Sequence, residues 1–164
     1  MPIRPAIAAD IPAILALEKM SATAAHYSEE QYGKIIEQGL KFSAANWPGS
    51  RGKEEGQAPL ALIMEEDSRV RGFLIGRVLG TEWEIENVVI AEEARRQGLG
   101  TVLVGEFLQI ARERGGLTMY LEVRESNAAA RRLYEKCRFA ETGRRRKYYG
   151  APDEDAILYS RRLE

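Results

Sequence analysis

Two arginines followed by two glycines stand just before a helix-forming segment, an arrangement that could hold a phosphate-bearing ligand. The stretch reads Arg95-Arg96-Gln97-Gly98-Leu99-Gly100-Thr101. Apolar residues recur at helical spacing after Gly100, so we expect the glycines at a helix N-terminus. The first backbone N–H groups of a helix lack partners within it and carry partial positive charge, so they can donate to phosphate oxygens. Glycine leaves room for the phosphate, and the arginines add charge.

A second group of residues able to do chemistry follows this helix. Leu117, Met119, Leu121 and Val123 alternate with polar residues, the period of a strand, and Glu122 lies on that strand. A run of alanines then predicts a helix, with Ser126 or Asn127 as its cap and Tyr134 about two turns further on. Taken alone, these positions fit a solvated carboxylate, a helix cap and a core aromatic residue.

Together these stretches resemble the Gcn5-related N-acetyltransferases, the GNAT family. The family's cofactor motif, Arg/Gln-x-x-Gly-x-Gly/Ala, is matched at residues 95–100. Leu-Glu-Val-Arg at 121–124 and Ser-Asn-Ala-Ala-Ala at 126–130 are similar to the bacterial branch that acetylates the N-terminal alanine of a ribosomal protein. Residues 145–149 resemble the last hairpin of that branch. The resemblance is loose over residues 2–20 and good over 59–163.

The resemblance implies the fold and the cofactor. The fold is a single-domain α/β GNAT-like fold with a mixed central sheet of about seven strands and four helices, in the order β-α-α-β-β-β-α-β-α-β-β. The cofactor is acetyl-CoA, with no metal. The strand before the arginines is expected to splay from its neighbour and pair its backbone with the pantetheine amides. The residues implied in cofactor binding are Val88, Val89, Ile90, Arg95, Arg96, Gln97, Gly98, Leu99, Gly100, Thr101, Asn127 and Tyr134.

Catalysis by direct attack needs a base, because an α-amine has a pKa near 8 and must be neutral to attack a thioester. We expect Glu122 to be that base, directly or through one water, and the resemblance assigns Tyr134 the role of general acid. Tyr148 and Tyr149 are expected to shape a slot for a peptide N-terminus, with His26 beside it. The implied partner is a protein N-terminus, by resemblance the alanine of a small-subunit ribosomal protein.

Several alternatives remain open. Transfer to a small amine or a lysine is one, and a non-catalytic acyl-CoA binding module is another. A dinucleotide fold is disfavoured because Leu103 stands where its third glycine would be. An acyl-cysteine at Cys137 is disfavoured because no histidine is near in sequence, and a lone cysteine is usually a small buried residue.

The chain also departs from the family pattern. Arg138 stands where related sequences have a glycine that ends the helix in a left-handed conformation, so it must accept strain or end the helix differently. Residues 25–28 lack the Pro-Trp often found near the acceptor site, so the acceptor is less well defined than the cofactor. The basic run at residues 144–147 is typical of a solvated strand edge.

Length and composition indicate one domain over residues 1–164. The chain has 45% hydrophobic and 30% charged residues and a net charge of −1, so no overall charge draws it to nucleic acid or membrane. No apolar run approaches the roughly 20 residues of a membrane span, and Met1-Pro2-Ile3-Arg4 does not begin a signal peptide. One cysteine cannot form an internal disulfide, and a cytoplasmic location is expected. Oligomeric state does not follow from these patterns.

The remaining elements follow from periodicity and caps. Asp10 with Pro12 predicts one helix start, and the capping box at Ser28 predicts another. Residues 43–58 read as a flexible loop. We expect strands at 3–7, 59–66, 69–79, 82–90 and up to about 123, a helix ending near 137, and a closing hairpin over 139–162.

Overall fold

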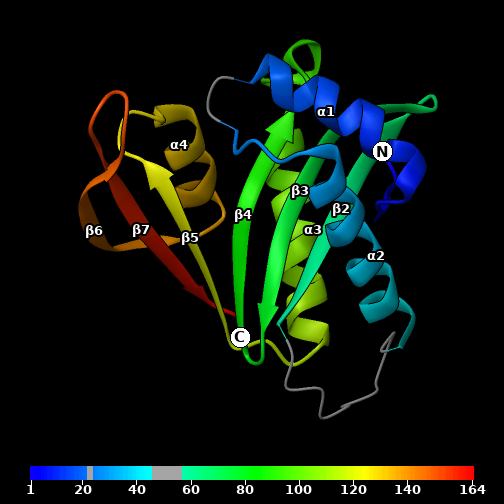
Figure 1. Ribbon diagram of the computed structural model, residues 1–164. Coiled ribbons are helices and arrows are strands. Elements are labelled where there is room, and N and C mark those ends of the chain that lie inside the picture. The colour runs from blue at the N-terminus through cyan, green and yellow to red at the C-terminus, as the bar shows by residue number, and fades with distance from the viewer. Residues whose placement is uncertain (22–23, 46–56) are drawn as a thin grey trace.

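The computed structural model describes residues 1–21, 24–45 and 57–164, which form one seven-stranded sheet with helices on both faces (Figure 1). The strands are β1 (Ile3–Pro5), β2 (Gln57–Glu66), β3 (Arg69–Leu79), β4 (Glu82–Ile90), β5 (Thr118–Arg124), β6 (Ala140–Tyr149) and β7 (Glu154–Arg162). The α-helices in these ranges are α1 (Ile11–Met20), α2 (Glu29–Ala45), α3 (Leu99–Glu113) and α4 (Ala128–Lys136). The predicted order of elements is confirmed. Two single turns of 3-10 helix add to it, η1 (Ala8–Asp10) and η2 (Glu92–Ala94).

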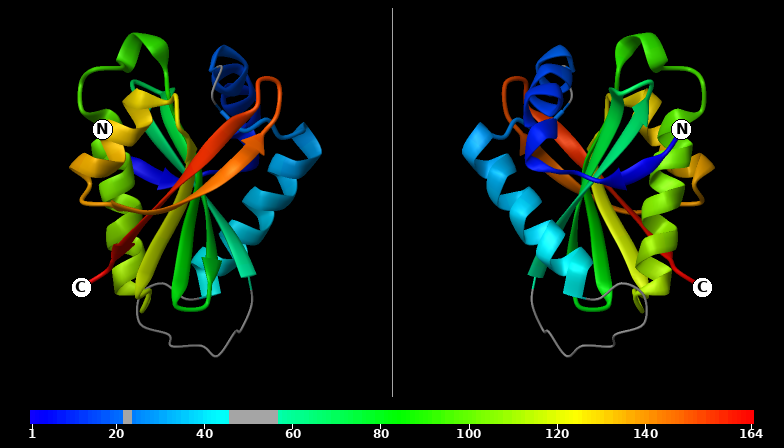
Figure 2. Two further views of the ribbon diagram at one scale, coloured as in Figure 1. Left: turned by 90° about the vertical axis from the view of Figure 1, so that its left-hand side faces the viewer. Right: turned by 90° about the vertical axis from the view of Figure 1, so that its right-hand side faces the viewer.

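The sheet is mixed, with the strand order β1-β2-β3-β4-β5-β7-β6. Only β4 and β5 pair in parallel, and the other neighbours are antiparallel. Helices α1 and α2 cover one face, and α3 and α4 cover the other (Figure 2). Each face has its own apolar cluster because strand residues alternate: Phe73 and Ile75 point toward α1 and α2, whereas Leu74 points toward α3.

Some predicted boundaries shift. Helix α2 begins after the Ser28 capping box, in which the Gln31 N–H donates to Ser28 Oγ at 3.1 Å. The helix runs on to Ala45 and β2 begins at Gln57, so both ends of the predicted 43–58 loop are regular structure. Residues 46–56 of that loop lie outside the described residues. Strand β1 stops at Pro5, and Leu117 is 62% exposed ahead of β5 instead of facing the core.

Helix α4 has well-defined ends. The Asn127 side chain accepts from the Ala130 N–H at 3.2 Å, as expected of a cap. At the other end Arg138 has φ 64°, and the N–H groups of Arg138 and Phe139 donate to the carbonyl oxygens of Glu135 and Tyr134. This pair of bonds is a Schellman motif, in which Arg138 takes the left-handed position usually given to glycine. Of the two possibilities left by the sequence, the structure shows that Arg138 accepts the strained conformation.

Strand β4 opens away from β5 halfway along its length. Their ladder ends at the pair Ile85 and Leu121, although β4 continues to Ile90 beside β3. The register of β3 and β4 skips Glu86, which is therefore the extra residue of a β-bulge. The two strands diverge visibly beyond this point (Figure 1). This opening, flanked by α3 and α4, brings the predicted site residues to one region of the fold.

Within the described ranges, the longest apolar helical segment is too short to cross a membrane.

Candidate active site

The upper half of β4 offers backbone groups along its open edge. Val88, Val89 and Ile90 lie beyond the end of the β4–β5 ladder, and their other edge pairs with β3. Val89 is buried, and Val88 and Ile90 pack partly against the α3 side of the sheet. The predicted splay is therefore present, and the side chains of these residues belong to the core. Their peptide groups on the β5 side can pair with an extended ligand as a further strand would.

The predicted phosphate loop lies at the N-terminus of α3. Its N-cap residue Gly98 has φ 75°, a left-handed conformation that favours glycine. The first backbone bond at this end runs from the Val102 N–H to the Gly98 carbonyl oxygen at 3.2 Å. The amides of residues 99–101 therefore lie in the first turn, where helix geometry gives them no internal acceptor. They are available to anionic oxygens, and the helix dipole adds to that attraction.

Glycine is favoured at positions 98 and 100 of the loop for different structural reasons. A Cβ on Gly98 would meet open space, so only its backbone conformation calls for glycine. A Cβ on Gly100 would lie 3.2 Å from Leu133 of α4, so Gly100 lets α3 approach α4 closely. The structure adds helix packing as a reason for glycine at position 100, and the room that both glycines are expected to leave for a phosphate stays a prediction.

The loop arginines are exposed, and one of them returns to the strand. Arg95 Nε donates to the Ile90 carbonyl oxygen at 3.1 Å, at the end of the open edge of β4. Arg96 has φ 62°, and Arg96 and Gln97 are both exposed. These side chains can reorient toward a polyanionic ligand without breaking core contacts.

Glu122 lies on the face of β5 opposite the α3 core. Its neighbours in sequence, Leu121 and Val123, are buried against that core, so alternation sends Glu122 to the other face. Its side chain is 25% exposed, and one oxygen lies 2.9 Å from Nε of Arg145 on β6. Arg145 and Glu122 come together because both pair with β7, at Ala156 and Leu158 respectively.

Tyr134 lies on the α3 and α4 side of the same strand. Its ring packs edge-to-face on Phe139 with centroids 5.8 Å apart, and it is 7% exposed. Burial raises the pKa of the Tyr134 phenol above its usual value, so the hydroxyl keeps its proton at neutral pH. A protonated phenol is the form that a general acid requires. The core reading and the acid reading are compatible here.

Tyr149 lies beside Arg124, which is two residues after Glu122 on β5. Burial raises the pKa of Tyr149, and the negative charge of Glu122 raises this pKa further. Tyr149 in turn adds to the raised pKa of Tyr134. Its ring packs edge-to-face on Tyr148 at 5.1 Å and lies under the Arg124 guanidinium at 4.2 Å. The structure therefore places Tyr148 and Tyr149 beside Arg145 and Arg124 on the Glu122 side of β5, with Tyr134 on the other side of the strand.

His26 belongs to the segment between α1 and α2. Its Nδ1 lies 3.2 Å from Glu18 of α1, and its side chain is 63% exposed. Glu18 is buried, and it also accepts hydrogen bonds from the Tyr27 N–H and the Tyr32 hydroxyl. His26 therefore helps hold this segment in place. Within the described part of the chain, it forms no hydrogen bond or ion pair with Glu122 or Tyr149.

Sequence reasoning missed several charged residues on the same face as Glu122. Glu86, the bulged residue of β4, accepts from Arg77 Nε at 2.8 Å and from the Tyr27 hydroxyl at 3.3 Å. Burial raises the pKa of Glu84, and the charges of Glu86 and Glu122 raise it further. The signal for the two β4 carboxylates was present, since Glu84 and Glu86 alternate with the buried Trp83 and Ile85. No local signal pointed to Arg145 as the partner of Glu122.

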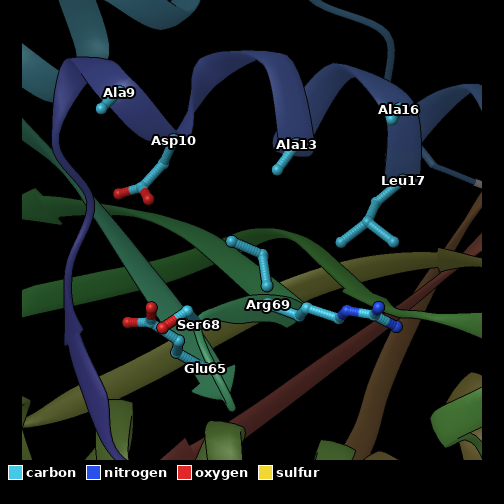
Figure 3. Close-up of a pocket in the computed structure, with 9 residues that line it drawn as sticks. Ala9, Asp10, Ala13, Ala16, Leu17, Glu65, Ser68 and Arg69 are labelled. Carbon is cyan, nitrogen blue, oxygen red and sulfur yellow. The ribbon is translucent and has the colours of Figure 1, made fainter.

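Cys137 and the basic run at residues 144–147 have the structural roles that the sequence favours for them. Cys137 is buried, and burial raises the pKa of its thiol, which disfavours the thiolate that a nucleophile needs. Strand β6 is an edge strand, and residues 144–147 are all exposed. A hollow of about 430 Å³ under the alanines of α1 is lined by none of the predicted site residues (Figure 3). Two carboxylates that line it, Asp10 and Glu65, are paired with Arg4.

Comparison with known proteins agrees with this geometry. The family model described as "Acetyltransferase (GNAT) family" matches residues 21–139. The chain is 37% identical over 106 residues to the ribosomal protein bS18-alanine N-acetyltransferase of Escherichia coli K12, covering 63% of this chain and 72% of that protein. It is 36% identical over 113 residues to the protein of the same name from Haemophilus influenzae, covering 67% and 77%.

A solved structure extends the similarity to the whole fold. The crystal structure of the ribosomal-protein-S18-alanine N-acetyltransferase from Escherichia coli superposes with a TM-score of 0.75 at 30% identity, covering 99% of this chain and 94% of that one. The family match, the open edge of β4 and the helix N-terminus at Gly98 agree with one another. The chain belongs to the acetyltransferase (GNAT) family and is an acetyl-CoA-dependent N-acetyltransferase.

Proposed function

We propose that the chain transfers acetyl from acetyl-CoA to the N-terminal α-amine of a protein, with Glu122 as base and Tyr134 as acid. The observation that carries this proposal is the position of the two groups on opposite faces of β5, just where β4 separates from it. A proton acceptor and a proton donor thus flank a single opening. We further propose that residues 1–164 form one such domain and that it acts in the cytoplasm.

The donor side of the opening fits a ligand with a long amide-containing arm and a pyrophosphate. The open edge of β4 at residues 88–90 can pair with the amides of the arm. The first-turn amides of α3 can receive the pyrophosphate, and Arg95, Arg96 and Gln97 can add donors. We assign Asn127 a place beside the arm, in addition to its role as the α4 cap. When bound, acetyl-CoA supplies the thioester that carries the acetyl group.

The chemical roles of the two residues follow from their surroundings. The Glu122 carboxylate can take the proton that the acceptor ammonium must lose before its nitrogen can attack. The Tyr134 hydroxyl, kept protonated by burial, can donate to the departing sulfur. We assign Tyr148 and Tyr149 to the binding of the acceptor, because they lie on the Glu122 face of the sheet. The Arg145 guanidinium lies over the Tyr148 ring, and the Arg124 guanidinium lies over the Tyr149 ring. His26 remains a candidate at the margin of that face.

The names of the relatives suggest the acceptor. Proteins at 36–37% identity are named for the alanine of ribosomal protein bS18, so the N-terminal alanine of that protein is the first acceptor to test.

The test measures thiol release from acetyl-CoA by the purified chain with three acceptors. These are a peptide copying the bS18 N-terminus with a free alanine, the same peptide with its α-amine blocked and a lysine added, and a small diamine. We expect release with the first peptide only, with the acetyl group located on the α-nitrogen by mass spectrometry. Turnover only with the lysine peptide or the diamine would contradict the proposal, as would cofactor binding without turnover on any amine.

The Glu122→Gln variant tests the base. We expect kcat to fall by about 10²- to 10⁴-fold, the range that a positioned proton acceptor contributes. Glu125→Gln is the matched control, since Glu125 is also a carboxylate paired with an arginine at 2.9 Å but lies past the end of β5. Equal losses in both variants would remove Glu122 from the role of base.

A further inference from the structure

Arg145 occupies the carboxylate that the proposed mechanism must keep free for the acceptor. Its Nε lies 2.9 Å from Glu122 Oε1, and among the described residues it is the one cationic side chain in ion-pair contact with Glu122. A second carboxylate lies on the same face of the sheet, because Glu84 of β4 pairs with Tyr120, two residues before Glu122 on β5. One guanidinium and two carboxylates thus lie on the face where an amine must arrive.

The acceptor reaches this point as a cation. A peptide α-amine has a pKa of about 7.7 to 8, so at neutral pH most of it is ammonium. An ammonium and a guanidinium compete for the same carboxylate oxygens. Arg145 therefore competes with the acceptor nitrogen for Glu122, and the Oε1 atom is available to the acceptor only when the guanidinium leaves it.

The surroundings of Arg145 allow it to leave. Its side chain is 57% exposed, so water screens the ion pair with Glu122 and breaking this pair costs little free energy. Its guanidinium already lies 5.5 Å from the centre of the Tyr148 ring, where a cation is stabilised by the aromatic face. The β6–β7 register is interrupted between Arg145 and Tyr149, and Lys147 has φ 51°, so the strand just after Arg145 is not held by a regular ladder.

We propose that the Arg145 guanidinium is a resident substitute for the acceptor's ammonium, which pairs with Glu122 in the free enzyme and is displaced by the incoming amine. Arg145 then moves toward Tyr148, at the wall of the acceptor slot. Glu84 keeps the region attractive to a cation after the exchange. This inference rests on the proposed role of Glu122 and identifies the acceptor site as selective for an amine that arrives charged.

The alternative role of Arg145 is a permanent support that holds Glu122 in its working position. The two roles predict opposite effects of removing the guanidinium. A displaced competitor, once removed, leaves the acceptor bound more tightly. A support, once removed, leaves kcat lower and gives the acceptor no gain in affinity.

The experiment measures the dissociation constant of a peptide with a free N-terminal alanine by calorimetry, in the presence of CoA so that no turnover occurs. We expect Arg145→Gln to bind this peptide about two- to fivefold more tightly than wild type, the range given by exposed ion pairs. Arg145→Lys keeps the cation and should bind as wild type does. In turnover the KM for the same peptide should fall in proportion for Arg145→Gln.

Three controls isolate the ion exchange. Arg146→Gln removes a neighbouring exposed cation that is not part of the ion pair with Glu122, and it should leave the dissociation constant of the peptide unchanged. The same peptide with an acetylated N-terminus carries no ammonium, so Arg145→Gln should not tighten its binding. In a Glu122→Gln background the effect of Arg145→Gln should disappear, because the contested carboxylate is gone.

Unchanged or weaker binding of the free peptide to Arg145→Gln would overturn the proposal, as would equal tightening of the acetylated peptide. These outcomes distinguish failure of the substitute role of Arg145 from failure of the proposed function. Normal turnover that depends on Glu122, without tightening in Arg145→Gln, defeats the substitute role alone. Tightening without any acetyl transfer to the peptide defeats the proposed function alone.

Discussion

Asp10 was predicted as a helix cap, and its carboxylate instead ties β1 to the turn before α1. Both of its oxygens accept from the Arg4 guanidinium at 2.8 Å, and one also accepts from the Ile7 N–H at 2.8 Å. The Asp10 side chain is only 8% exposed. These hydrogen bonds, chiefly the two from Arg4, hold the pKa of Asp10 below its usual value.

The lowered pKa of Asp10 makes stability depend on pH in a defined window. The pair stabilises the fold fully above the unfolded-state pKa, about 3.9, and the contribution is lost as pH falls through the lower pKa of the folded state. We expect wild type to exceed Asp10→Asn in urea midpoint at pH 6, with the difference closing below about pH 4. Urea unfolding between pH 7 and pH 2.5 measures this.

The exposed turn residue Asp67 supplies the control for this prediction. Among the residues that the structure describes, the Asp67 carboxylate forms no ion pair, so Asp67→Asn should follow wild type across the whole pH range. A gap between wild type and Asp10→Asn that persists unchanged at pH 2.5 would show that the charge of Asp10 is not the cause.

Single residues differ in how far the sequence can place them. The elements that carry Glu122 and Tyr134 could be predicted from motif and spacing, whereas the catalytic roles of these residues stay predictions. The alanines indicated a cap at Ser126 or Asn127, and the structure shows that Asn127 is the cap. Arg145 could not be paired with Glu122, since their contact depends on two separate registers with β7. The requirement for glycine at position 76 could not be predicted from the sequence either. A Cβ there would lie 2.2 Å from the Phe107 ring, a contact that exists only once α3 covers the sheet.

At the scale of elements, the end of α4 offers a direct test of backbone strain. Arg138 occupies the left-handed position of a complete Schellman motif, closed by the 5.8 Å ring contact of Tyr134 with Phe139. A residue with a Cβ pays roughly 1 kcal/mol or more in that conformation, and glycine does not. We expect Arg138→Gly to raise the free energy of unfolding by about 1 kcal/mol, part of the gain being offset by the more flexible unfolded chain.

Arg138→Ala distinguishes relief of strain from loss of charge. Alanine removes the guanidinium but keeps the Cβ, so its stability in urea should stay near that of wild type. If Arg138→Ala gained as much as Arg138→Gly, the charge of Arg138 and not its backbone conformation would be the source of the effect.

Elements with strong periodic patterns were predicted closely. The expected strands at 69–79 and 82–90 match β3 and β4, because alternation and short polar turns fix both ends. The bulge at Glu86 was not predicted, since an extra residue in one strand is defined only by the partner strand. The first end of the expected 43–58 loop was misread because the small residues at 43–45, two of them alanines, do not stop a helix that has already begun.

At the scale of the molecule, the opening between β4 and β5 is bridged by few contacts of the sheet itself. A parallel ladder of four residue pairs joins β4 to β5. The remaining contact between the two halves of the sheet is made by the apolar cluster that the strands share with α3 and α4. A ligand that fills the opening would therefore tie the two halves together. Binding to the folded state alone stabilises it by about 2.7 kcal/mol at a ligand concentration of 100 Kd.

We accordingly expect CoA at that concentration to raise the melting temperature by about 5 to 10 °C. Pantetheine lacks the nucleotide and its phosphates, so at equal concentration it should give a much smaller shift. Calorimetric scans with each ligand measure both effects. Equal shifts from CoA and pantetheine would show that the α3 N-terminus contributes nothing to binding.

The fold class followed from the whole order of elements, and the position of the opening followed only from the resemblance. Periodicity identifies β4 and β5 as strands but carries no information about where their pairing stops. That point depends on the bulge at Glu86 and on the packing of Leu133 against Gly100, both of which are long-range.

The open edge of β4 consists of peptide groups, which every amino acid except proline carries in full. Exchanges among β-branched residues at 88–90 would therefore leave donor recognition intact, provided that the strand keeps its shape and its buried side remains filled. Proline scanning across this short segment, and not alanine scanning, is the mutagenesis that would expose its contribution.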